Sequence, residues 1–74
     1  MKHINNLNKY VIDNDRLRAL RGEVSREVVG EKIGVGGSQI ANIEQGIRVP
    51  SGNKLIRLMM LYNVRPEQIA KLAE

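Results

Sequence analysis

Small polar side chains recur at helical spacing in residues 37–45, and such side chains can hydrogen-bond to the edges of nucleic-acid bases. Ser38, Ala41, Asn42 and Gln45 share one face of a predicted helix, and two isoleucines form the opposite, inward face. Asparagine can bond bidentately to adenine N6 and N7, which gives about 1–3 kcal/mol of discrimination. These side chains are shorter than those on an ordinary solvent-exposed helix surface, and they are too polar to pack in a core. We therefore interpret them as a DNA-reading surface. The alternative for Asn42 and Ser38 is plain exposure, with Ser38 bonding its own first turn.

Long cations stand on both sides of this helix in the sequence. Arg26 precedes it and Arg48 follows it, in a chain with 12 basic and 8 acidic residues and a net charge of +4. From Gln45 to Pro66 there are four cations and no acid. The pattern favours a basic surface that binds a polyanion, and the alternative is an ordinary solvent-exposed charged face. Glu44 would repel DNA from such a surface, so an intramolecular ion pair is the better interpretation of this acid.

The residue types that catalysis and metal binding need are almost absent. The chain has no Cys and a single His, His3, which excludes thiol nucleophiles, thiolate metal sites and paired histidines. The Gly34-x-Gly36-Gly37 cluster is not a phosphate-binding loop, because no strand is predicted before it. No apolar run approaches the ~20 residues of a membrane span. We therefore expect no enzyme activity, no cofactor, no metal site and no membrane association.

The elements that must position these side chains are short helices around one small core. A chain of 74 residues makes one domain and buries only about 60–65% of its unfolded surface. Because there is no Phe and no Trp, the core must be aliphatic. Capping residues, apolar periodicity and terminators predict five helices, no sheet and short connections. The expected helices begin at about Asp13 and end at Gly22, run from Ser25 to Gly34, over 37–45 and over 53–62, and begin again at Pro66.

One glycine stands in the middle of the second expected helix. Gly30 costs this helix roughly 0.5–1 kcal/mol relative to alanine. A glycine at this position predicts that another backbone approaches closely. Two further residues, Gly34 and Asn63, are predicted to end the second and fourth helices in the left-handed conformation.

The two ends of the chain carry less specific patterns. Residues 1–12 contain apolar residues at helical spacing, whereas Tyr10-Val11-Ile12 suits a short strand or an arm. We assign residues 1–12 to an N-terminal arm or extra helix and residues 13–74 to the main domain. At the other end, Ile69 and Leu72 are expected to point inward from the fifth helix.

Residues 25–46, SREVVGEKIGVGGSQIANIEQG, are typical of a helix, a glycine-centred turn and a second helix. The pattern S-x-E-x-x-G-E-K-I-G-V-x-x-S-Q-I-A-x-I-E-x-G within them resembles the lambda-repressor-like helix-turn-helix family, which includes Cro, repressor and XRE-type proteins. A second block beginning at Pro50-Ser51 has the family's spacing for its fourth helix, and the resemblance covers about residues 17–72. It implies an all-α fold, a five-helix lambda-repressor-like DNA-binding domain with its helix-turn-helix at about 25–46.

The resemblance also implies roles for individual residues at matching positions. The base-facing positions are Gly37, Ser38 and Asn42. The positions that contact the phosphate backbone are Gln39, Gln45 and Arg48, and Arg26 occupies a position that contacts phosphate or supports a base contact. Arg21 and Glu44 match an internal ion pair that ties the first helix to the third.

The sequence departs from the family pattern at the start of the reading helix. Gly36-Gly37 replaces a Ser or Thr cap and a long polar side chain, so position 37 cannot offer a side-chain hydrogen bond to a base. Arg26 stands where the family usually has Gln. Specificity is therefore expected to depend on the remaining polar side chains of the helix and on DNA shape. The two glycines either bring the backbone close to phosphate or only give the turn its conformation.

The function implied by the resemblance is sequence-specific binding of double-stranded DNA by a transcriptional regulator. We expect a small Cro- or repressor-like protein of a phage or mobile element, bound to its operator as a homodimer, in the cytoplasm of a bacterial cell. The alternative is a protein-interaction module on the same fold, such as an antitoxin or an antirepressor-type partner. Met60 motivates it, because it lies off the main apolar stripe and methionine is common at adaptable interfaces.

Overall fold

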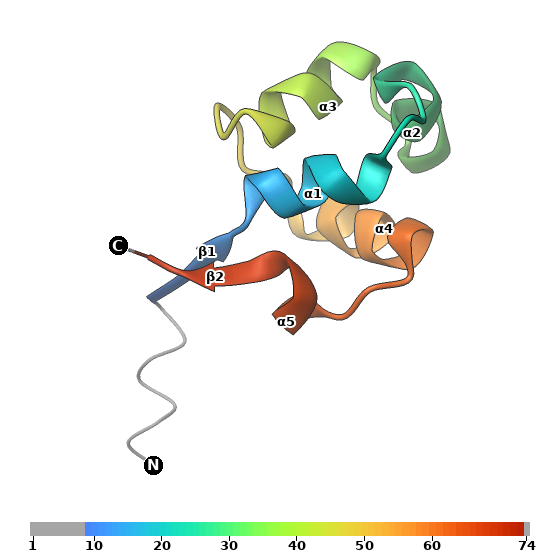
Figure 1. The fold of residues 1–74 in the computed structure, drawn as a ribbon. Helices are drawn as coiled ribbons and strands as arrows, with labels where there is room; N and C mark the ends of the chain where they lie inside the picture. Colours follow the sequence, from blue (N-terminus) through green and yellow to red (C-terminus); the bar gives the residue numbers. More distant parts are fainter. Residues whose placement is uncertain (1–8, 74) are drawn as a thin grey trace.

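The computed structural model describes residues 9–73, and within this range the chain forms five helices and a small sheet. The five predicted helices are confirmed, whereas His3 and the first eight residues of the predicted arm lie outside the described range. In Figure 1, α2 and α3 lie at one end of the molecule, and the sheet and α5 lie at the other. The elements in chain order are β1 (Tyr10–Ile12), α1 (Asn14–Arg21), α2 (Arg26–Ile33), α3 (Gly37–Glu44), α4 (Gly52–Tyr62), α5 (Pro66–Ile69) and β2 (Ala70–Leu72).

Polar caps fix the starts of three helices. Asp13, Ser25 and Ser51 each accept a hydrogen bond from the backbone N–H three residues further on, at 3.1, 3.2 and 3.4 Å. Each bond satisfies a donor that has no partner within its helix. Asn63 ends α4 in the left-handed conformation, with φ 56°, as predicted.

The prediction of a chain without a sheet is wrong. Residues 10–12 form an edge strand that pairs with residues 70–72, and the Asp13 N–H donates to the Ile69 carbonyl at 2.8 Å beside this ladder. The backbone becomes extended at Ala70, and strand pairing then gives backbone groups of both segments their hydrogen-bond partners. Leu72 is consequently 59% exposed and does not point inward, although Ile69 is buried as expected. The antiparallel register is Tyr10↔Leu72, Val11↔Lys71 and Ile12↔Ala70.

The core is aliphatic, as predicted, and forms two adjoining clusters. Tyr62 packs against both of them from the last turn of α4. The first cluster joins α2, α3 and α4 and comprises Val29, Ile33, Ile40 and Leu58. The second joins α1, α3 and α5 and comprises Leu17, Ile43 and Ile69. Because α3 contributes to both clusters, its inward face is fixed and its outward face is fixed with it.

Candidate nucleic-acid interface

The turn between α2 and α3 sets how the two helices cross. Gly34 ends α2 with φ 86° and ψ 30°, and the Val35 N–H donates to the Gly30 carbonyl at 2.8 Å. A Cβ atom placed on Gly30 would lie 2.5 Å from the Val35 carbonyl oxygen. The close backbone approach predicted at Gly30 is confirmed, and this contact holds the start of α3 against α2.

The outward face of α3 carries the small polar residues. Ser38 and Gln45 are exposed and Asn42 is half-buried, on the side opposite the two buried isoleucines. The helix ends at Glu44, one residue earlier than expected, so Gln45 is its C-cap. Gly37 is the first helical residue and is half-buried beside Glu27, whose side chain a Cβ at position 37 would meet at 2.7 Å.

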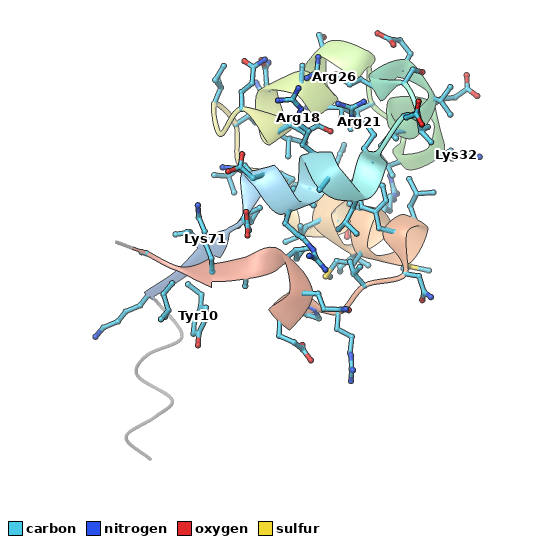
Figure 2. All side chains as sticks on the ribbon, in the orientation of Figure 1. Tyr10, Arg18, Arg21, Arg26, Lys32 and Lys71 are labelled. Atoms are coloured by element: carbon cyan, nitrogen blue, oxygen red, sulfur yellow. The ribbon has the colours of Figure 1, made fainter. Side chains whose placement is uncertain are left out.

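Glu44 points inward from α3 and is only 8% exposed. Arg21 of α1 binds it with two hydrogen bonds, Nε to Oε2 at 2.7 Å and Nη2 to Oε1 at 3.1 Å. Arg21 also donates to the Val24 carbonyl at 2.9 Å, so one guanidinium ties α1, the turn before α2 and α3 together. Figure 2 shows Arg21, Arg26 and a third arginine, Arg18, on the side where α1 faces α3.

Arg26 makes a contact that the sequence did not indicate. Its Nε donates to Glu44 Oε1 at 3.2 Å, while its side chain remains 34% exposed. Burial raises the pKa of Glu44, but the hydrogen bonds from Arg21 and Arg26, with their charges, outweigh burial and leave this pKa below its ordinary value. The carboxylate is therefore ionised at neutral pH and shared by two guanidinium groups. Two guanidinium groups thus neutralise the one acid of α3.

A hollow of about 300 Å³ lies between α3 and the start of α4. Gln39, Arg48 and Lys54 line it together, next to the Ser51 cap. Two cations and the N-terminal end of an 11-residue helix favour an anion at this position. Lys54 was not predicted as a site residue, although it belongs to the run of cations without acids between Gln45 and Pro66.

The other cations of that run have partners in the fold. Arg57 donates from Nη1 to the Ile33 carbonyl at 3.1 Å and so caps the end of α2 from α4. Arg65 lies 3.7 Å from Glu67 in a pair that is exposed on both sides. Arg48 and Lys54 are thus the members of the run that line the hollow beside α3.

Met60 lies elsewhere on the molecule. It is 76% exposed on α4 and belongs to neither core cluster.

The described residues also bear on metal binding and membrane insertion. Residues 9–73 contain no group of three or more His, Cys, Asp or Glu side chains that could hold a metal ion. Within the same range, none of the helices has the combination of length and apolar character that crossing a membrane requires.

Comparison with known protein families gives a match over most of the chain. The sequence model of the family described as "Helix-turn-helix domain" matches residues 15–72, which run from the second residue of α1 to the last residue of β2. No curated protein and no solved structure matches the chain.

Proposed function

The chain belongs to the helix-turn-helix domain family, and from this premise we propose that it is a sequence-specific double-stranded DNA-binding transcriptional regulator. In this proposal α3 enters the major groove and α2 crosses the DNA backbone beside it. The DNA-binding unit spans residues 13–74, and the paired part of the N-terminal arm, β1, is joined to it through β2.

The observation that carries the proposal is the division of charge on α3. Its acid, Glu44, is buried and held by two arginines, whereas Ser38, Asn42 and Gln45 face outward. The burial of Glu44 takes the one acidic side chain of α3 away from the outward face, where it would repel DNA phosphates. The remaining outward side chains offer hydrogen-bond donors and acceptors that can pair with the edges of bases.

We assign base contacts to Ser38 and Asn42, with the backbone of Gly37 close to the DNA. Phosphate contacts are assigned to cations and amides around the helix, because they position the protein without reading sequence. These residues are Arg26, Gln39, Gln45, Arg48 and Lys54. Each phosphate that a cation neutralises should add about 0.9 to the slope of log K against log salt.

One such domain covers few base pairs, so we propose a homodimer on the operator. Two-fold symmetry would place the half-sites about one helical turn, ~34 Å, apart on a palindromic sequence. We further propose a Cro- or repressor-like regulator of a phage or mobile element, acting on the DNA of its bacterial host, because residues 25–46 resemble the pattern of that group.

Replacing Asn42 with alanine is expected to weaken binding to the specific site by about five-fold to 150-fold for each Asn42 that reads a base, corresponding to the 1–3 kcal/mol of a bidentate base contact. Binding to unrelated DNA should stay within about two-fold, because phosphate contacts supply it. Fluorescence anisotropy with both duplexes measures the two affinities. Gln68→Ala removes an exposed amide from α5, at the end of the molecule opposite α3, and serves as the control. Equal losses on both duplexes would show that Asn42 does not read a base.

Substitutions at Gly36 separate stability from DNA binding. Gly36 is the N-cap of α3, has ordinary extended angles of φ −80° and ψ 163°, and makes no side-chain cap bond. A Cβ there has open space, with Ser38 Oγ the nearest atom at 4.0 Å. Serine and aspartate should each stabilise the fold by about 0.5–1 kcal/mol through a cap bond and a less flexible unfolded chain. Aspartate alone should weaken DNA binding, several-fold at low salt, because it adds negative charge beside the reading helix. Urea denaturation and anisotropy give the two quantities, and equal DNA affinities of the two variants would place DNA away from this end of α3.

A second candidate function, a protein-interaction module, is favoured by the exposure of Met60. A large apolar side chain that is 76% exposed on a helix suits a partner surface. On this alternative, Met60→Glu abolishes binding to a protein partner and Asn42→Ala has no effect. On the proposed function, Met60→Glu leaves binding of one domain to a half-site duplex unchanged, and only dimer formation can be sensitive to it. Anisotropy with half-site DNA and analytical ultracentrifugation distinguish these results.

A further inference from the structure

A larger hollow, of about 630 Å³, lies between the sheet and the loop that follows α3. Its inner part is formed by Leu55, Met59 and Ile69, which are buried or half-buried. The loop residue Val49 lines its rim and is 80% exposed. Ligand sites of proteins typically have volumes of about 300–1,000 Å³ and mostly apolar walls, so this groove has the size and the lining of such a site.

The charged side chains that line the groove, among the described residues, are all basic. Arg48 and Lys71 line it, and among the described residues that line it none carries a carboxylate. Figure 2 shows Lys71 extending from β2 on the side of the sheet that faces the rest of the fold. A second copy of the chain would bring the same two cations to the contact, so self-association through this groove is disfavoured. The charge complements an anion.

We propose that the groove binds a small amphiphilic carboxylate, whose apolar body fills the inner part and whose carboxylate is held by Arg48 and Lys71. Arg48 and Val49 line this groove and also the hollow beside α3 to which we assign a DNA phosphate. A carboxylate on Arg48 therefore competes with that phosphate. The ligand weakens the binding of DNA, and DNA weakens the binding of the ligand by the same factor, because the two binding free energies are reciprocally linked. This antagonism rests on the proposed function, whereas ligand binding does not.

The test uses decanoate as the probe and the full chain without DNA. NMR titration of the isotope-labelled protein, below the micelle-forming concentration, is expected to shift the methyl signals of Met59 and Val49. Decyltrimethylammonium, which has a similar chain and the opposite charge, should bind at least ten-fold more weakly. Equal affinity for the two amphiphiles would overturn the proposal, because it would show apolar adsorption without recognition of the anion.

Two variants localise the binding. Val49→Glu puts a carboxylate on an exposed rim position and is expected to weaken decanoate binding at least ten-fold. Ile56→Glu makes the same change on an exposed apolar residue of α4 that does not line the groove, and it should leave decanoate binding unchanged. Circular dichroism checks that both variants are folded. Equal effects of the two substitutions would overturn the assignment to this groove.

The coupling is measured separately by anisotropy with labelled DNA. Saturating decanoate is expected to weaken DNA binding by five-fold or more, and Arg48→Gln should abolish that difference. Decanoate binding with unchanged DNA affinity would overturn the antagonism and leave the ligand site standing. Absence of DNA binding with or without decanoate would count against the proposed function and not against the groove.

Discussion

Replacing Gly30 with alanine is expected to destabilise the domain by about 2 kcal/mol. The new Cβ would lie 2.5 Å from the Val35 carbonyl oxygen and 3.0–3.1 Å from the carbonyl carbon and oxygen of Gly36, all of them backbone atoms. Overpacking against backbone atoms, which cannot rotate away, should lower the free energy of unfolding by an amount near the upper end of the usual 1–3 kcal/mol. The better helix propensity of alanine offsets about 1 kcal/mol of this loss. The turn must move outward, so α3 should also lose its position and DNA affinity should fall.

Gly52→Ala is the matched control for this substitution. Gly52 is the first residue of α4, and a Cβ there meets nothing within 4 Å. The same chemical change should therefore leave stability unchanged or raise it by up to about 1 kcal/mol. Urea denaturation followed by far-UV circular dichroism gives both values. If Gly30→Ala proved as stable as Gly52→Ala, the close approach between α2 and the turn would be wrong.

Replacing Glu44 with alanine is expected to destabilise the domain by about 3 kcal/mol, the lower end of the range for breaking a buried ion pair. The lower end applies because Arg26 is partly exposed and can return to water, whereas Arg21 is left with only the Val24 carbonyl. The core of so small a domain rarely supplies more than about 3–5 kcal/mol, so the variant should be close to unfolded. Thermal and urea unfolding measure the loss.

Glu67→Ala is the control for this second variant. Glu67 pairs with Arg65 at 3.7 Å, and both side chains are more than two-thirds exposed. Exposed pairs of this kind contribute about 0–1 kcal/mol, so the control should be nearly neutral. A similarly small effect at Glu44 would contradict a structural role for the ion pair.

The same ion pair makes stability depend on pH. Because the folded-state pKa of Glu44 is lowered, its contribution is fully present above the unfolded-state pKa, about 4.3, and is lost as the pH falls through the lower folded-state value. The free energy of unfolding should therefore decline below about pH 5, and Glu44→Gln, which cannot ionise, should show a shallower decline. Urea midpoints measured over this pH range test it. Parallel pH profiles of the two proteins would exclude Glu44 as the titrating group.

Most helices could be predicted because their ends are set by local chemistry. Ser25 and Ser51 begin helices and Gly34 and Asn63 end them through bonds and backbone angles that involve only near neighbours. Gly30 could be interpreted correctly because a glycine that weakens a helix needs a reason elsewhere in the fold. Membership of the helix-turn-helix family, indicated by residues 25–46, is likewise confirmed.

The features that could not be predicted depend on segments far apart in the sequence. The strand alternative for Tyr10–Ile12 is confirmed, but its partner β2 was predicted to be helical, because the pairing joins opposite ends of the sequence. Arg26 contacts Glu44 because α2 begins beside the end of α3. The two residues are far apart in the sequence, so their spacing does not predict this contact. Lys54 enters the candidate site because α4 starts next to the loop that contains Arg48.

The most direct test of sequence-specific DNA binding is fluorescence anisotropy with the duplex that flanks the protein's own gene and with a shuffled duplex of the same composition. Measurements at two salt concentrations separate phosphate contacts from base contacts. We expect tight binding to the flanking duplex, loss of that preference on shuffling, and loss of the same preference in Asn42→Ala. Equal affinity for both duplexes at both salt concentrations, unchanged in Asn42→Ala, would contradict reading of the major groove by α3.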